Sequence, residues 1–444
     1  MLLTIEKLIY GGDGLARLPA DNSGRGKTAF VPFVLENEKI EATIIEQKPG
    51  FARAKADAIL DPSPHRVGPE CPYFGQCGGC HYQHTSYEHQ LEIKKQILNE
   101  TLRRIAKVDL SIEIAVHPSP PWNYRNRSRL QVQIAPSFSA GYFKMGSHQL
   151  LAVEQCPISS PLINRGIAVL WQSGRAQKVP KGLREVEFFA NASDTQVLIE
   201  AYCGPDSRRS TVRTWAEELK TSMPEVGGVV VFRESDKGPA HAADKLLTVG
   251  ADHLTYETAR AQYKVSAGSF FQTNRFLTDE LVRIVTTGQS GHLAMDLYAG
   301  VGLFSTALAS DIHHIVSVES SQTSSADLAY NQLSNGEVVQ ATTEQYLARA
   351  KDSGRVGKGA VLPHIFHKPD LAVIDPPRSG LGERVARMFV TLGAPRVVYV
   401  SCDPATLARD LVILLASGYR IEQVHLVDLF PQTFHLESVV HLAR

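Results

Sequence analysis

Hydrophobic and polar positions alternate through the N-terminal part of the chain, and this alternation predicts short strands. The clearest runs are Thr28 to Leu35 and Lys39 to Glu46, each bounded by glycine-containing turns. Short strands with such closely spaced turns are typical of a small antiparallel barrel. We therefore predict an OB-like β-barrel over residues 1–60, followed by a proline-containing linker at Asp61-Pro62-Ser63-Pro64.

The apolar spacing changes to a helical period after the linker. From His84 to Lys107 the leucines and an isoleucine recur at intervals that place them on one stripe of a helix. Strand patterns return between Trp122 and about Tyr263, which predicts a central α+β unit. The clearest of these runs are Leu130 to Ile134, Glu185 to Ala190 and Val226 to Phe232.

Strands and helices alternate from Ala267 to the C-terminus, which is typical of a parallel, doubly wound α/β sheet. The polar stretch from Lys351 to Pro369 is predicted to be a surface loop. The expected elements are a strand ending at Asp296, a helix from about Leu303, a strand from Ile315 to Val318, and strands ending at Asp375 and Ser401.

Composition narrows the class of protein. The chain has 444 residues, of which 43% are hydrophobic and 21% charged, as in ordinary soluble proteins, and this length predicts about three domains. The first residues lack the basic segment of a signal peptide, and no apolar run approaches the ~18 residues of a membrane span. We expect a cytoplasmic protein that does not contact membranes. Basic and acidic residues both number 46, so any nucleic acid must be bound by local charge.

A glycine turn follows the strand that ends near Asp296. Gly300 and Gly302 let the backbone approach a nucleotide-like ligand, and Glu319, at the end of the next strand, can accept hydrogen bonds from ribose hydroxyl groups. A dinucleotide fold would place glycine or alanine where Ser305 stands. The acidic strand end favours the cationic sulfonium of S-adenosylmethionine over NAD or FAD, with a purely structural turn as the other alternative.

Two further strand ends carry groups suited to covalent chemistry. Asp375 precedes two prolines and Arg378, and Cys402 follows the next strand. An aromatic residue in place of Arg378 would favour methylation of an exocyclic amine, whereas a nearby cysteine favours methylation of carbon. C5 of uracil becomes nucleophilic when a thiolate adds to C6, so Cys402 is the predicted nucleophile. The alternative is a buried structural thiol.

Glu437 is the candidate base that removes the C5 proton. On a strand, His435 and Glu437 share a face. The alternative is an exposed strand carboxylate with no catalytic role.

Four cysteines have the spacing of metal ligands. Cys71, Cys77 and Cys80 are grouped, and Cys156 precedes a proline further along the chain. The spacing fits an iron–sulfur cluster and a structural zinc site equally well, and unrelated buried thiols are the third alternative.

Arg125, Arg127 and Arg129 alternate along a predicted strand beside Trp122 and Tyr124. Such a stripe suits RNA phosphates and unpaired bases, although a solvated strand face would have the same pattern.

With these motifs in place, the chain resembles the RNA uracil-C5 methyltransferases, which make 5-methyluridine in ribosomal and transfer RNA. The resemblance runs nearly end to end and implies that the barrel is a TRAM domain. It implies a [4Fe–4S] cluster on Cys71, Cys77, Cys80 and Cys156. It also implies cofactor contacts from Gln272, Tyr298, Glu319 and Asp375, with Cys402 as nucleophile and Glu437 as general base.

The resemblance implies three domains, two of which are each formed by two separate segments of the sequence. Residues 1–60 form the barrel, 61–83 and 119–261 the cluster-bearing central domain, and 84–118 and 262–444 a Rossmann-like class I methyltransferase domain. A barrel together with a cluster favours 23S rRNA as the substrate over transfer RNA, and we expect a monomer. The rivals are a methyltransferase for another base and a non-catalytic, cluster-carrying RNA-binding protein.

Overall fold

The computed structural model describes residues 1–19, 26–234, 243–332, 334–353 and 368–444. Most of the loop expected between Lys351 and Pro369 lies outside the described residues. In the described part of the chain, no helix is both long and apolar enough to cross a membrane.

The N-terminal strands close into a barrel with the order β1-β2-β3-β5-β4. Their inward positions are apolar, as the alternating burial along β1 illustrates, and Ile5, Val31 and Ile40 are fully buried. A closed barrel in this part of the chain is therefore confirmed, although β3 and β5 pair in parallel and not antiparallel as predicted. The strands are β1 (Leu2–Leu8), β2 (Asp13–Arg17), β3 (Thr28–Pro32), β4 (Lys39–Gln47) and β5 (Phe51–Asp61).

The predicted helix is present as α1 (Tyr87–Thr101), and it continues into a π-helical turn, η1 (Leu102–Ala106). The Ser86 side chain caps its N-terminus, and Lys107, with φ of 58°, ends it. Lys94 is completely buried in an ion pair with Asp428, at 2.6 Å between Nζ and Oδ1. Because breaking a buried pair leaves an uncompensated charge, this contact fixes α1 to the C-terminal part of the chain.

The central part of the chain forms a seven-stranded sheet of order β13-β12-β11-β10-β7-β8-β9. Its core includes Trp171 from the first of its two helices and Trp215 from the second. The elements are β7 (Arg127–Gln133), β8 (Ser139–Phe143), β9 (Leu150–Ala152), α2 (Pro161–Arg175), β10 (Leu183–Ala190), β11 (Val197–Cys203), α3 (Arg209–Ser222), β12 (Val226–Glu234) and β13 (Ala243–Gly250).

The C-terminal part of the chain forms an eight-stranded sheet of order β18-β17-β16-β19-β20-β22-β21-β6. The first five strands in this order, from β18 through β17, β16 and β19 to β20, run parallel to one another. Strand β22 runs antiparallel to β20. The strands are β6 (Ile114–His117), β16 (Gly291–Leu297), β17 (Ile312–Glu319), β18 (Gly336–Gln340), β19 (Leu371–Ile374), β20 (Arg396–Ser401), β21 (Arg420–Val427) and β22 (Glu437–Ala443). A separate hairpin precedes the sheet, made of β14 (His253–Glu257) and β15 (Gln262–Ser266).

Helices cover both faces of this sheet, as the alternating pattern predicted. One face packs on α1, η1, α7, α8 and α9 through residues such as Leu98 and Phe389. The other packs on α4, α5 and the β14–β15 hairpin through residues such as Phe304 and Tyr263. The helices are α4 (Thr278–Thr286), α5 (Leu303–Leu308), α6 (Gln322–Asn331), α7 (Thr343–Ser353), α8 (Gly382–Val390) and α9 (Pro404–Ala416).

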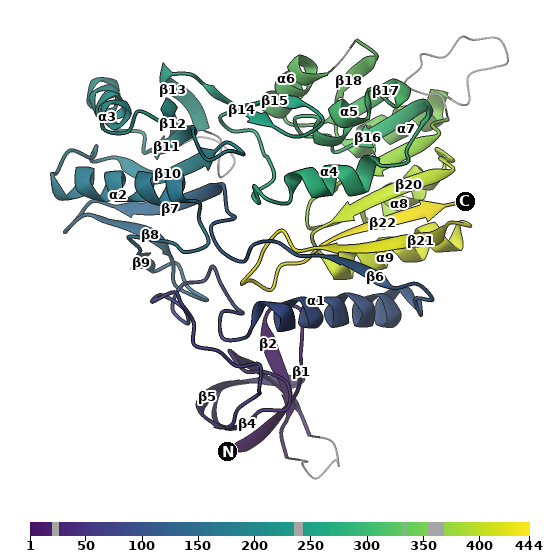
Figure 1. Cartoon of the computed structure of the whole chain (residues 1–444), viewed down its shortest axis with the longest axis horizontal. Coiled ribbons are helices and arrows are strands. Elements are labelled where there is room, and N and C mark those ends of the chain that lie inside the picture. Colours follow the sequence, from purple (N-terminus) through teal and green to yellow (C-terminus); the bar gives the residue numbers. More distant parts are fainter. Residues whose placement is uncertain (20–25, 235–242, 333, 354–367) are drawn as a thin grey trace.

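Figure 1 shows how these units are arranged. The barrel lies at the bottom, the seven-stranded sheet at the upper left and the eight-stranded sheet at the right. Helix α1 runs between the barrel and the eight-stranded sheet, beside the edge strand β6. Residues 114–117, far from the C-terminal strands in sequence, therefore belong to their sheet.

Candidate active site

The carboxyl ends of four neighbouring parallel strands bring the predicted cofactor and reaction residues to one edge of the sheet. Strands β17, β16, β19 and β20 are adjacent in that order. Glu319 ends β17, Tyr298 follows β16, Asp375 follows β19 and Cys402 follows β20. In open α/β sheets ligands bind outside the carboxyl ends of the strands, so these four side chains border one site.

The turn after β16 has the backbone that a close-fitting ligand needs. Tyr298, Gly300 and Gly302 have φ of 65°, 57° and 93°. The Gly300 N–H donates to Glu319 Oε2 at 2.9 Å, so the turn and the ribose-binding candidate are in contact. A Cβ on Gly300 would meet nothing within 4 Å, whereas one on Gly302 would lie 2.7 Å from Leu328 Cδ1. Gly300 thus faces open space, and Gly302 is required by packing.

Gln272 lies in the segment between β15 and α4, and it is buried. Asp327 holds the start of this segment, accepting from the Ser266 N–H at 2.7 Å and from the Ser269 hydroxyl at 2.6 Å. Asn274 holds its end by donating to the Leu429 carbonyl at 3.1 Å. Phe270, between these anchors, is 64% exposed.

Cys402 and Glu437 lie opposite each other across two paired strands. Ser401, the last residue of β20, pairs with Ser438 in β22. Cys402 follows Ser401 and Glu437 precedes Ser438, so in this antiparallel pair the two residues lie at the same end. Cys402 is half-buried, and Glu437 is buried. Asp403 caps α9 by accepting from the Ala405 and Thr406 N–H groups, so the thiol directly precedes a helix N-terminus.

Three carboxyl groups lie at this end of the sheet and form no salt bridge with any described residue. Among the described residues, Asp296, Asp375 and Glu437 make no ion pair. Burial raises the pKa of Asp296 to about 7, and burial followed by repulsion from Asp296 raises the pKa of Asp375 to about 7. Burial and then Asp375 also raise the pKa of Glu437 well above its usual value, while Arg378 opposes this rise.

The same environment acts on the candidate nucleophile. Burial, then Glu437 and Asp375, raise the pKa of the Cys402 thiol to about 12, and Arg378 partly offsets the rise. The thiol is therefore protonated in the free protein near neutral pH. A positive charge brought to this edge would stabilise both the thiolate and the ionised carboxylates.

The four predicted cysteine ligands line one cavity of about 330 Å³, together with Arg125, Lys144 and Tyr142. Burial, then the nearby Cys156, raise the pKa of Cys80, and burial raises that of Cys77 to about 11. In the described part of the chain, no three His, Cys, Asp or Glu side chains form a group that could hold a metal ion. Cys203 is buried and lies outside this cavity.

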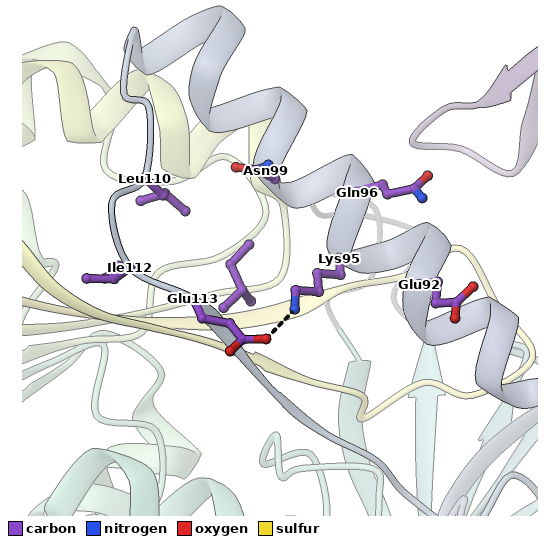
Figure 2. A pocket seen from close by; sticks show the side chains of 8 residues that line it. Glu92, Lys95, Gln96, Asn99, Leu110, Ile112 and Glu113 are labelled. Carbon is purple, nitrogen blue, oxygen red and sulfur yellow. Dashed lines mark hydrogen bonds and ion pairs between the residues drawn. The ribbon is translucent and has the colours of Figure 1, made fainter.

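A second cavity, of about 310 Å³, lies between α1 and the segment that leads into β6. Figure 2 shows the Lys95–Glu113 ion pair, 2.9 Å between Nζ and Oε1, reaching across it below Leu110 and Ile112. None of the predicted site residues lines this cavity.

The arginines of the predicted stripe have partners within the protein, and their contact with RNA stays a prediction. Arg127 forms ion pairs with Glu187 and Glu200, at 3.1 Å to Glu200 Oε1, and donates to the Ser269 carbonyl at 2.5 Å. Arg129 pairs with Glu187 at 2.5 Å and with Glu185. Arg125 lines the cysteine cavity instead.

Neighbouring strands supply the countercharges of Arg127 and Arg129. Glu185 and Glu187 lie on β10 and Glu200 lies on β11, and β10 pairs directly with β7. The network also reaches the cofactor segment, because Glu200 accepts from the Gly268 N–H at 3.1 Å. The arginines thus hold the central sheet against the segment that carries Gln272.

Sequence reasoning missed Tyr10. Its hydroxyl donates to the main-chain carbonyl of Cys402 at 3.2 Å, from the turn between β1 and β2. Only the β-rich pattern around it was visible in the sequence, and no local signal connects it with a cysteine near the other end of the chain.

Comparison with known proteins identifies the family. A family model described as tRNA (Uracil-5-)-methyltransferase matches residues 86–444. The chain belongs to this family. An uncharacterized RNA methyltransferase of Aquifex aeolicus is 32% identical over 99% of this chain and 97% of its own length. A second relative with the same description, from Listeria monocytogenes, is 30% identical over 99% of this chain and 96% of its own.

The fold is shared with a solved structure over the whole length of both chains. The Pyrococcus abyssi tRNA (uracil-54, C5)-methyltransferase, in complex with S-adenosyl-L-homocysteine, superposes with a TM-score of 0.74 at 23% identity. The protein is an S-adenosylmethionine-dependent RNA uracil-5-methyltransferase with an N-terminal five-stranded barrel.

Proposed function

We propose that this uracil-5-methyltransferase uses Cys402 as its nucleophile and Glu437 as its general base, with 23S rRNA as the substrate. The observation that carries the proposal is the register of β20 and β22, which sets the two residues opposite each other beside Asp375. A nucleophile and a base bordering one cofactor edge are what C5 methylation requires.

The chemistry follows from these positions. In its thiolate form, Cys402 bonds to C6 of the uracil, and the C5–C6 electron pair moves onto the ring as an enolate. C5 then bonds to the methyl group of the sulfonium donor, which becomes a neutral thioether. Glu437 takes the C5 proton, the C6–sulfur bond breaks, and the double bond and the thiolate are restored. Cys402 ends as the thiolate that began the cycle, its resting thiol proton having passed to solvent beforehand, and Glu437 ends with the proton from C5.

The cofactor is held by residues at the neighbouring strand ends. We assign the ribose hydroxyl groups to Glu319 and the close backbone approach to Gly300. The complete proposed set is Gln272, Tyr298, Gly300, Gly302, Glu319 and Asp375. The P. abyssi enzyme, which shares this fold, contains S-adenosyl-L-homocysteine in its structure.

Incubation with RNA containing 5-fluorouracil tests the mechanism. Fluorine cannot leave as a cation, so the reaction should stop as a covalent adduct that survives denaturing electrophoresis. The Cys402→Ala variant should give neither adduct nor product, whereas Cys203→Ala, which changes a buried thiol remote from the site, should retain both. Normal methylation by Cys402→Ala would refute the assignment.

The substrate has a second candidate. The barrel together with the cysteine cavity favours 23S rRNA, while the whole-length likeness to a tRNA (uracil-54, C5)-methyltransferase favours transfer RNA. Methylation assays with 23S rRNA fragments and with a transfer RNA transcript decide between them. Mapping of 5-methyluridine in RNA from a deletion strain then identifies the position.

We further propose that the cysteine cavity holds a [4Fe–4S] cluster on Cys71, Cys77, Cys80 and Cys156. The fit is supported by four thiols around one cavity with Arg125 and Lys144 on its wall, since cationic groups stabilise thiolates. Bound there, the cluster would cross-link the segment of residues 71–80 to Cys156. Protein purified without oxygen should be brown and contain four iron atoms and four sulfides per chain; a colourless, zinc-containing product would overturn the assignment.

The remaining assignments concern the units and their partners. We propose that the barrel, residues 1–60, is a TRAM domain that binds RNA, that 61–83 with 119–261 form the central domain, and that 84–118 with 262–444 form the catalytic domain. We also propose that the protein acts as a monomer. Sedimentation of the protein without RNA tests whether it is a monomer. Sedimentation with substrate RNA, compared between the full chain and a chain without the barrel, tests whether the barrel contributes to RNA binding.

A further inference from the structure

The barrel reaches the reaction site through one turn. Tyr10 follows β1, and its hydroxyl group donates to the main-chain carbonyl of Cys402 at 3.2 Å. Cys402 stands between the last residue of β20 and Asp403, the N-cap of α9. A hydrogen bond at this carbonyl therefore acts on the peptide unit that joins the nucleophile to the helix.

The turn is shaped for this close approach. Gly11 and Gly12 have φ of 112° and 92°, a backbone that other residues rarely adopt. A Cβ on Gly12 would lie 3.0 Å from His81 Cβ, so the turn lies tightly against the residue that follows Cys80. The Ile9 N–H donates to the Asp13 carbonyl at 3.0 Å and closes the turn.

Aromatic packing fixes the Tyr10 ring beside the segment that leads into β22. The ring meets the edge of Phe434 at 5.4 Å between centroids, and Phe434 also contacts His81 at 4.6 Å and His435 at 4.3 Å. His435 lies two residues before Glu437, the first residue of β22. Tyr10 also packs against the core of the eight-stranded sheet, so its side chain belongs to both units.

We propose that Tyr10 is a positioning residue for the methylation reaction, through which the barrel fixes the peptide that carries Cys402. This inference rests on the proposed role of Cys402 as nucleophile. It assigns the barrel a part in the reaction site in addition to RNA binding. Burial, then Asp403, raise the pKa of Tyr10, so its hydroxyl remains a hydrogen-bond donor at every working pH.

Tyr10→Phe and Tyr82→Phe form a matched pair of variants. Tyr82 belongs to the same buried cluster, and among the described residues its hydroxyl has no hydrogen-bond partner. Each variant loses one hydroxyl and keeps its ring, but only Tyr10→Phe removes the bond to Cys402. A single net hydrogen bond accounts for about a three- to tenfold change in rate.

Two rates are measured, each at saturating S-adenosylmethionine. The first is adduct formation with 5-fluorouracil RNA, and the second is alkylation of Cys402 by iodoacetamide without RNA, as a function of pH. Tyr10→Phe should slow adduct formation about three- to tenfold at saturating RNA and change the alkylation profile. RNA affinity and S-adenosyl-L-homocysteine affinity should stay as in the wild type, and Tyr82→Phe should match the wild type in adduct formation and in the alkylation profile.

Wild-type rates in Tyr10→Phe would overturn the proposal. A loss confined to RNA affinity or thermal midpoint would also overturn it, because that pattern belongs to a purely structural contact. If the wild-type protein forms no adduct, the proposed nucleophile fails, and the alkylation profiles still show whether Tyr10 acts on Cys402.

Discussion

Two groups of buried carboxylates in this protein differ in how their charge is compensated. In the seven-stranded sheet, Glu187 pairs with Arg127 and Arg129, and Arg127 also pairs with Glu200. At the end of the eight-stranded sheet, Asp296, Asp375 and Glu437 make no ion pair within the described residues. Burial opposes ionisation in both places, but the two arginines lower the pKa of Glu187, whereas the pKa of Asp375 rises to about 7.

The difference separates structural charge from functional charge. A paired carboxylate holds strands together, and its countercharge is part of the chain. An unpaired carboxylate destabilises the free protein, and in the proposed site the sulfonium of the methyl donor would supply the missing positive charge on binding. Perturbed pKa values gather at functional sites for this reason.

The largest expected effect is the loss of turnover when Glu437, one of the unpaired carboxylates, is replaced. Glu437→Gln keeps the size of the side chain but removes the base, so turnover should fall by about 10²–10⁴-fold. The methylated adduct with ordinary RNA should accumulate, because the C5 proton is not removed; Cys402→Ala forms no adduct at all. Denaturing electrophoresis with labelled RNA checks this.

Glu257→Gln is the matched control, since Glu257 is an exposed strand carboxylate. It should turn over as the wild type does. An equal loss in both variants would contradict the assignment of Glu437 as base.

The second prediction concerns the free energy of unfolding, which should fall when a paired charge of the seven-stranded sheet is removed and should not fall when an unpaired carboxylate of the eight-stranded sheet is removed. Arg127→Met leaves Glu187 and Glu200 buried with less countercharge, which should lower the free energy of unfolding by about 3–5 kcal/mol. Asp375→Asn removes an uncompensated carboxylate, so at pH 8 its free energy of unfolding should equal or exceed that of the wild type. Urea unfolding measures both.

The sign for Asp375 depends on pH. Its pKa is about 7 in the folded protein against a usual value of 3.8, so the unfolded chain loses this proton first as pH rises. Stability is therefore lost between about pH 4 and pH 7 and stays low above that range. The advantage of Asp375→Asn should vanish at pH 4; the same advantage at pH 4 and pH 8 would contradict this account.

The third prediction uses the cofactor's charge. Because Asp296 and Asp375 have pKa values of about 7 in the free protein, binding a sulfonium below that pH must displace protons. Affinity for S-adenosylmethionine should fall by up to about tenfold per pH unit below pH 7. S-adenosyl-L-homocysteine, whose sulfur is neutral, should depend on pH less steeply. Calorimetry in two buffers counts the protons released, and equal pH slopes for the two ligands would contradict the role of the carboxylates.

The smallest expected effect is on cofactor affinity, and it concerns the backbone of the turn after β16. Gly300→Ala and Gly288→Ala both place a Cβ in open space at positive φ, 57° and 73°, and each should lower stability by about 1 kcal/mol. Only Gly300→Ala adds a methyl group beside the proposed cofactor, so it alone should weaken S-adenosyl-L-homocysteine binding, by several-fold. Equal affinities in the two variants would remove Gly300 from the site.

Sequence patterns predicted the parts of this molecule that depend on local order. Alternation identified the barrel, and the strand ends at Asp375 and Cys402 were located because buried runs end in recognisable polar residues. The ion pairs of the arginine stripe could not be predicted, because the partners of Arg127 lie on strands whose pairing with β7 has no local signature. Tyr10 was missed for a related reason, since its contact joins the first and last units of the chain.

The edge strand β6 has a consequence for biosynthesis. Ile114 pairs with Val424, so this strand leaves the ribosome long before its hydrogen-bonding neighbour exists. At ~5–20 residues per second the delay is roughly 15–60 s. During that time an apolar edge is open to wrong pairing, while α1, which is already synthesised, packs beside it. Nascent chains halted before β21 should therefore recruit chaperones more strongly than chains released at full length.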